Sequence, residues 1–270
     1  MRAFLLGATV LALAACGSNG DDNNSPDPSD PVNPMDPTDP NDPPTAEEKA
    51  RDNDELAAIL AAHIRGEFPI QLLAADISEG RFPEGFAVTG QTAEESTGAG
   101  VSGGLNFDFT YHCNDGSTAH LIVPCDGNAH HSHIKLTVTG SQSMGAIAMT
   151  EINRVVDWEI RDLTLDKARF RGPDGLSLKT SVSTNGEAAQ YGVQFNATYE
   201  QVRYLSGYTY PTFGTIDFTI NTERTRGSDH RIFNSTAKVT FGSSGVPTTL
   251  VIDGSANYTI NLTSGEVVKL

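Results

Sequence analysis

The sequence predicts a mainly β protein, an antiparallel meander of roughly nine or ten strands with one N-terminal helix before it. Three observations lead to this fold class. Only 19% of the 270 residues are charged and 26 are glycine, a composition that suits β-rich rather than helical proteins. From residue 100 onward, apolar residues alternate with polar ones. Turn signals rich in glycine, proline and asparagine separate the alternating runs.

The alternating runs predict strands with one buried face and one solvent face, which is typical of antiparallel sheets. The gaps between the runs are too short for the helices that parallel strands would need. Turns are predicted at 172–175, 184–187 and 242–247. The runs occupy 105–113, 134–138, 156–160, 176–182, 191–199, 216–220, 233–241 and 250–262.

The sequence is compatible with three architectures for this meander, namely a barrel, a two-sheet sandwich, or a half-barrel curled around the helix. The half-barrel would resemble the periplasmic carriers and lipoprotein receptors of the outer-membrane sorting pathway, in architecture alone. No sequence motif carries that comparison.

Residues 1–15 have the features of an export signal, with a short positive start followed by an apolar run. The run ends in Leu13-Ala14-Ala15-Cys16, which resembles the lipobox of bacterial lipoproteins. The resemblance implies cleavage before Cys16, lipid on that cysteine, and a membrane partner reached through the lipid. Gly17, in place of Asp, implies the outer membrane by resemblance to the enterobacterial sorting pattern, with the periplasmic or the surface side left open. No later stretch reaches the roughly 18 consecutive apolar residues that a membrane span needs.

Residues 16–45 are predicted to be the lipidated cysteine and a disordered tether rich in Asp and Pro. Between 29 and 43, five successive triplets end in Asp-Pro or Asn-Pro, which matches the three-residue turn of polyproline II. Such a segment reaches roughly 90 Å when fully extended at about 3.1 Å per residue.

The acidity of the chain belongs mostly to this tether and its junction. The formal net charge is -16, and residues 17–55 hold 12 acidic and 2 basic residues. An acidic protein is repelled by phosphates, so nucleic-acid binding is excluded.

A helix is predicted over 46–66, and 67–270 is predicted to be the antiparallel β domain. Thr45 and Glu48 have the spacing of a capping box, and Gly66 is a plausible stop. Apolar residues recur between them at helical spacing, namely Leu56, Ile59, Leu60 and Ile64.

Residues 111–133 hold five of the seven histidines. In a strand, His131 and His133 project from the same face, which suits a metal with two imidazole ligands. His112 or His120 could reach in from the neighbouring strand, and Zn²⁺ or Cu²⁺ fits imidazole best. The alternative is that these histidines are ordinary solvated loop residues.

Cys113 and Cys125 are expected to form a disulfide, because an exported protein lies in an oxidising compartment. The bond closes a loop of about 13 residues, which in the chain-entropy model stabilises the fold by roughly 3 kcal/mol. Neither cysteine is then free to serve as a thiolate ligand.

A second candidate site is a loop that contains glycine, proline and four aromatic residues. The side chains could form a binding rim or pack over the end of the sheet. They are Tyr204, Tyr208, Tyr210 and Phe213.

No catalytic motif appears in the sequence, whether a G-x-S-x-G, an H-E-x-x-H or a P-loop. No catalytic residue and no organic cofactor is therefore predicted. The leading hypothesis is a non-enzymatic envelope lipoprotein whose β domain binds an envelope protein or an apolar ligand. Two alternatives are a metal-binding or metal-dependent hydrolytic domain that uses 112–133, and a structural component of the envelope.

Overall fold

The computed structural model describes residues 44–116, 121–144, 147–163, 168–184, 186–204, 209–243 and 246–270. All described residues belong to one compact unit. The predicted signal peptide, Cys16 and nearly all of the predicted tether lie outside the described residues.

The helix α1 (Ala46–Ser78) begins where the sequence predicts. The Thr45 hydroxyl accepts a hydrogen bond from the Glu48 backbone N–H, and the Glu48 carboxylate accepts one from the Thr45 backbone N–H. This reciprocal pair is the predicted capping box, and it satisfies two donors that the first turn leaves without helical partners.

The predicted end of the helix at Gly66 is wrong, because α1 continues without a break to Ser78 and includes Pro69. Gly66 instead allows a close approach to the sheet, since a Cβ there would lie 3.0 Å from Gln142 Oε1. The glycine that ends α1 is Gly80, at a φ of 74°. Its N–H donates to Ile77 O, and the next N–H donates to Asp76 O, which is the pattern of a Schellman motif.

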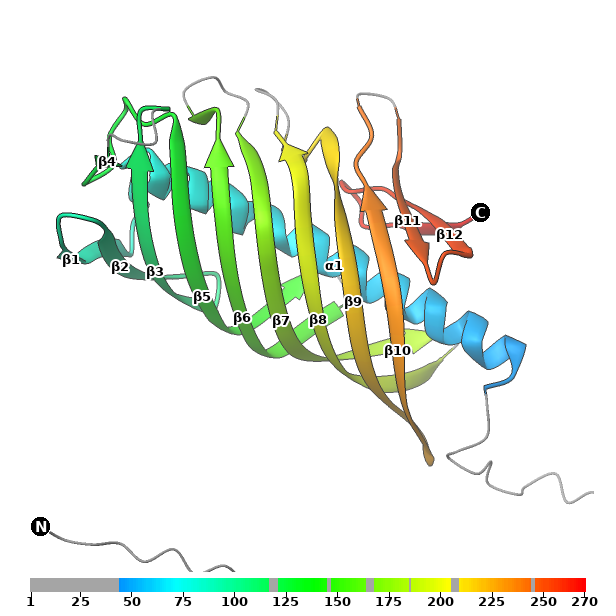
Figure 1. Ribbon diagram of the computed structural model, residues 1–270. Coiled ribbons are helices and arrows are strands. Elements are labelled where there is room, and N and C mark those ends of the chain that lie inside the picture. The colour runs from blue at the N-terminus through cyan, green and yellow to red at the C-terminus, as the bar shows by residue number, and fades with distance from the viewer. Residues whose placement is uncertain are drawn as a thin grey trace, which may run out of the picture. The chain divides into compact units, whose positions relative to one another are not determined.

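The rest of the described chain forms one antiparallel sheet that does not close (Figure 1). Its long central strands are joined as a meander, and the short strand β4 pairs with β3 beside the main path. The strands are β1 (Phe86–Gln91), β2 (Ser96–Ser102), β3 (Leu105–Asn114), β4 (Leu121–Ile122), β5 (His131–Met144), β6 (Ile147–Arg161), β7 (Arg169–Thr184), β8 (Glu187–Arg203), β9 (Phe213–Arg226), β10 (Asp229–Thr240), β11 (Thr248–Ile252), β12 (Ala256–Ile260) and β13 (Val267–Lys269).

The described sheet has 13 strands, more than the predicted nine or ten. The additional strands are short or lack apolar alternation, as in the Gly- and Thr-containing β2 and the three-residue β13. The run 250–262 contains a turn at Asp253 and Gly254, both at positive φ, and therefore supplies both β11 and β12.

The turn predicted at 172–175 is also wrong, because these residues lie inside β7. The pairing of β7 with β8 shifts register between Phe170 and Gly172, so the signal marks a bulge. A Cβ on Gly172, whose φ is 133°, would lie 2.2 Å from Asp157 O, and this close approach explains the glycine. The turns predicted at 184–187 and 242–247 do separate strands.

The sheet curls around α1, which lies along its inner face (Figure 1). The helix contacts β3, β5, β6 and β7, and also β11, β12 and β13 near the other edge. Residues 55–64 are therefore buried apart from the half-buried Ala58, and Leu56, Ile59 and Leu60 are fully inaccessible. By length and composition α1 is the one described helix that could cross a membrane, and 75% of the window that passes this test is buried inside the fold.

Candidate functional site

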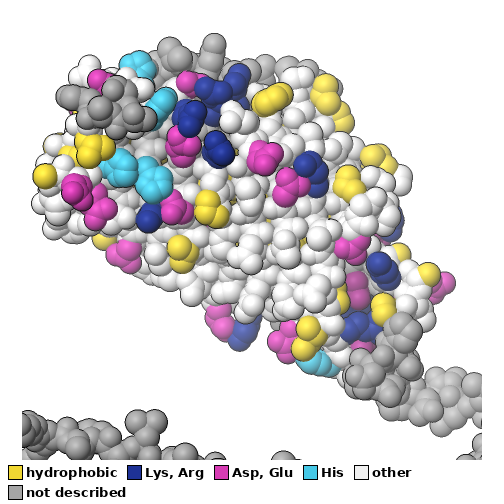
Figure 2. Space-filling view, in the orientation of Figure 1, with side chains coloured by type: hydrophobic (Ala, Val, Ile, Leu, Met, Phe, Trp, Pro, Cys, Tyr) yellow, Lys and Arg dark blue, Asp and Glu magenta, His cyan; other side chains and the backbone are white. Residues whose placement is uncertain are grey.

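Three of the four predicted histidine ligands lie on the outer face of the sheet. His112 and Asn114 on β3, and His131 and His133 on β5, occupy positions that alternate with buried residues. Together with four neighbours they line a recess of about 400 Å³, here called the histidine groove. The neighbours are Asp157 and Glu159 on β6 and Arg171 and Pro173 on β7, with Ser132 and Gly172 completing the lining. Figure 2 shows histidine side chains beside acidic and basic ones over this part of the sheet.

Register decides which histidines meet. His112 lies directly opposite His133 in the pairing of β3 with β5, and their ring centroids are 5.3 Å apart. His131 lies opposite Asn114 instead. The remaining predicted ligand, His120, lies outside the described residues.

Charged neighbours hold the ring of His133. Its Nε2 is 2.5 Å from Asp157 Oδ1, and Lys135 Nζ lies 3.6 Å from the other carboxylate oxygen. Partial burial lowers the pKa of His112 below 6.5, and the neighbouring His133 adds to this effect. His112 is therefore predominantly neutral at neutral pH, the form in which imidazole binds metals. Among the described residues, no group of three or more His, Cys, Asp or Glu side chains is arranged to hold a metal ion.

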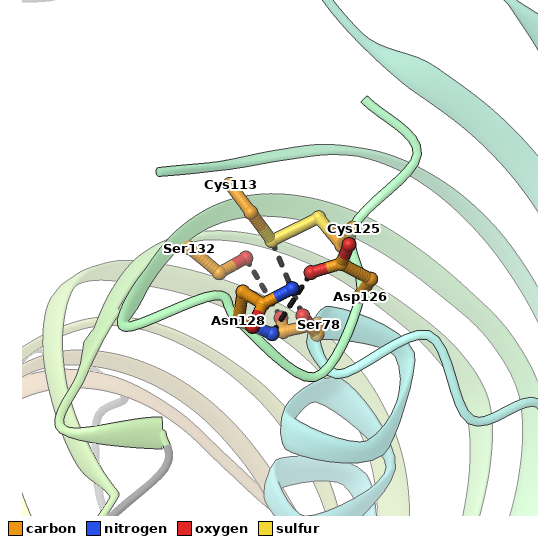
Figure 3. The surroundings of a disulfide bond; sticks show 6 residues. All are labelled: Ser78, Cys113, Cys125, Asp126, Asn128 and Ser132. Atoms are coloured by element: carbon orange, nitrogen blue, oxygen red, sulfur yellow. Dashed lines mark hydrogen bonds between the residues drawn. A yellow bond between two sulfur atoms is a disulfide. The ribbon is translucent and has the colours of Figure 1, made fainter. Parts of the chain in front are cut away.

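The predicted disulfide between Cys113 and Cys125 is confirmed (Figure 3). Cys113 Sγ lies 3.2 Å from the backbone oxygen of Ser78, at the end of α1. The Ser78 hydroxyl donates to the Ser132 hydroxyl at 2.7 Å. These contacts fix the residues next to His112 and His133 against the end of α1.

A second recess, here called the end groove, lies where the β8–β9, β10–β11 and β12–β13 connections meet. It has a volume of about 780 Å³, and its lining mixes threonines with apolar side chains. The lining residues are Thr209, Tyr210, Pro211, Thr212, Gly242, Ser243, Val246, Pro247, Thr248, Thr259, Ile260, Asn261, Leu262, Thr263, Glu266 and Val268.

The four aromatic residues predicted as a binding rim fall in different places. Tyr210 lines the end groove, and Phe213 is 58% exposed with the Arg203 guanidinium 5.8 Å from its ring centroid. Tyr204 is buried in the core, where it packs on Phe170 and its hydroxyl donates to the Gln71 amide oxygen. Tyr208 lies outside the described residues.

A buried network of charges, which no sequence motif predicted, joins α1 to β9. Arg226 Nη2 lies 2.7 Å from Glu55 Oε2, and Arg224 Nε lies 3.2 Å from Asp52 Oδ1. Burial raises the pKa of Glu55, but hydrogen bonds from Tyr191 and Arg226 outweigh it and leave the pKa below its ordinary value. Burial raises the pKa of Asp52 despite the two arginines.

A second buried pair, Arg154 on β6 and Asp174 on β7, lies inside the sheet. Two contacts join the side chains, at 2.9 Å and 2.7 Å, and the guanidinium lies 5.2 Å from the Trp158 ring centroid. The sequence holds a signal that could have predicted both networks. Arg154, Arg224 and Arg226 stand at inward-facing positions of their strands, where the alternation otherwise places apolar residues. All three arginines are buried against acidic partners.

No protein-family model, curated protein or solved structure matches this chain. The chemistry of the two grooves is therefore the basis for a functional assignment.

Proposed function

We propose that the protein is a non-enzymatic lipoprotein of the bacterial envelope, anchored through Cys16, that binds a partner protein at the end groove. The lipobox and the Asp/Pro-rich segment support the anchor and the tether. The end groove, with exposed apolar side chains at its border, is the observation that supports binding.

The two recesses that the described residues form against the inner side of the sheet are small. Because α1 occupies the inner face, the described recess beside His63 has a volume of about 20 Å³, enough for one water molecule. A recess between α1 and β1–β3 reaches about 290 Å³. The end groove, at about 780 Å³, is larger than either of these two recesses.

The border of the end groove has the composition of a protein interface. Val246 and Val268, which line it, are 57% and 48% exposed, and Phe213, which follows the lining residue Thr212 in sequence, is 58% exposed. Threonines, Asn261 and Glu266 surround these apolar side chains. Exposed apolar groups within a polar rim are typical of surfaces that bind other proteins.

Site-specific photo-crosslinking in intact cells tests this proposal. A photoreactive residue is placed at Phe213 or Val246, and, as matched controls, at Val155 on β6 or Ile232 on β10, which are about equally exposed. We expect one discrete crosslinked protein from the two groove positions and none from the controls. Equal crosslinking at all four positions, or none at the groove, would contradict the proposal.

A further inference from the structure

The histidine groove has the features of a second binding site, which does not depend on the partner proposed for the end groove. His112 and His133 project side by side from β3 and β5, with ring centroids 5.3 Å apart and ring planes at 46°. Two imidazoles that share one tetrahedral metal ion, with metal–nitrogen bonds of about 2.0 Å, have ring centroids roughly 5 Å apart. We propose that His112 and His133 together bind one transition-metal ion, Zn²⁺ or Cu²⁺, on the outer face of the sheet.

Asp157 is the positioning residue for this pair. Its Oδ1 lies 2.5 Å from His133 Nε2, so that nitrogen donates to the carboxylate and Nδ1 is left to bind the metal. Histidine ligands commonly donate their second ring N–H to a carboxylate, which fixes the orientation of the ring and makes it a stronger ligand.

The backbone that carries the two histidines is fixed by contacts on the inner side of the sheet. Cys113, next to His112, forms the disulfide, and Ser132, next to His133, is hydrogen-bonded to Ser78 of α1. Cys113 and Ser132 also lie opposite each other in the pairing of β3 with β5 (Figure 3). A pair fixed in this way loses little conformational freedom when an ion binds.

The donors select the class of metal. Ca²⁺ and Mg²⁺ require shells of oxygen ligands, whereas imidazole nitrogen suits Zn²⁺ and Cu²⁺. The acidic and basic side chains around the pair are equal in number, so we do not expect the groove to attract cations of every kind. They are Glu95, Asp157 and Glu159 against Lys135, Arg161 and Arg171. With two protein ligands, water fills the other positions, and the groove of about 400 Å³ leaves room for it.

Calorimetric titration of the full mature chain, tag-free and oxidised, with Zn²⁺ and Cu²⁺ tests the site. We expect one ion per chain, tighter binding of Cu²⁺, and a loss of affinity of about tenfold or more in His112→Ala and in His133→Ala. Asp157→Asn is expected to weaken binding by about tenfold. Circular dichroism of each variant establishes that the fold is retained.

The matched controls are His131→Ala, on the same strand and face as His133, and His230→Ala, whose ring pairs with Glu223 on another part of the sheet. Both are expected to bind as the unaltered protein does. Binding that is lost in His131→Ala but kept in His112→Ala would overturn the pair in favour of two ligands on one strand. Binding no tighter than millimolar in the unaltered protein, or unchanged binding in the His112→Ala, His133→Ala double variant, would exclude the site.

Discussion

Replacing Asp174 by Ala is expected to destabilise the protein strongly. The side chains of Arg154 and Asp174 are 2% and 0% exposed, and two short contacts join them. Removing the carboxylate takes away the anion that both contacts reach, while the guanidinium stays buried beside the Trp158 ring. The loss of one partner from a buried ion pair costs about 3–5 kcal/mol.

The expected shift in melting temperature depends on the length of the domain. One kcal/mol lowers the melting temperature by roughly 2–4 °C for a domain of this length, so Asp174→Ala should melt about 6–20 °C lower. The assay is urea and thermal unfolding, followed by circular dichroism and by the fluorescence of Trp158, the single tryptophan of the chain.

Asp217→Ala is the matched control, because Asp217 pairs with Lys238 at 3.1 Å and both side chains are about half exposed. An exposed pair contributes about 0–1 kcal/mol. If Asp174→Ala cost no more than Asp217→Ala, the structural role given to the buried pair would be refuted. Replacing both members, as Arg154→Met with Asp174→Leu, should recover much of the loss, because no buried charge is then left unpaired.

Three further outcomes are expected. Replacing Cys113 and Cys125 by Ser should lower the free energy of unfolding by roughly 3 kcal/mol, and the native oxidised protein should resist alkylation; reaction of both thiols would contradict the disulfide. Burial, with Arg154 nearby, holds the pKa of His63 well below 6.5. The free energy of unfolding should therefore decrease as the pH falls below 6.5, by up to about 1.4 kcal/mol per pH unit, because the unfolded chain takes up a proton that the folded His63 does not. His63→Phe, measured by urea unfolding across that range, should flatten this slope, and an unchanged slope would assign it to other groups. Thr45→Ala should lower the free energy of unfolding by about 1 kcal/mol, because the Thr45 hydroxyl no longer accepts from the Glu48 N–H. An unchanged melting temperature would contradict a stabilising N-cap at Thr45.

The strands could be predicted from the sequence because each long strand has one buried and one solvent face. β3 and β8 alternate in exposure almost residue by residue, as their apolar patterns predict. The short strands escaped prediction because pairing with a neighbour, not an apolar pattern, holds β2 and β13 in the sheet.

The full length of α1 could not be predicted, because two glycines compete as the stop. Gly66 lies inside the helix because it faces Gln142 across a tight contact, and Gly80 ends the helix through its positive φ. Only tertiary packing distinguishes the two positions.

The candidate site was predicted in composition but not in geometry. A period of two places His131 and His133 on one face, but the partner of each depends on the register between β3 and β5. That register joins His112 to His133 and leaves His131 opposite Asn114. The contribution of Asp157 depends on β6 and has no local signal in 111–133.

Metabolic labelling with a fatty acid tests whether the protein is, as we propose, a lipid-anchored component of the envelope. Cells expressing the unaltered chain or Cys16→Ser are labelled, fractionated into membrane and soluble parts, and probed for the protein. We expect the unaltered chain to carry the label and to require detergent for release, and Cys16→Ser to carry none. Labelling and membrane attachment that persist in Cys16→Ser, or an unaltered chain that carries no label, would exclude a lipid anchor at Cys16.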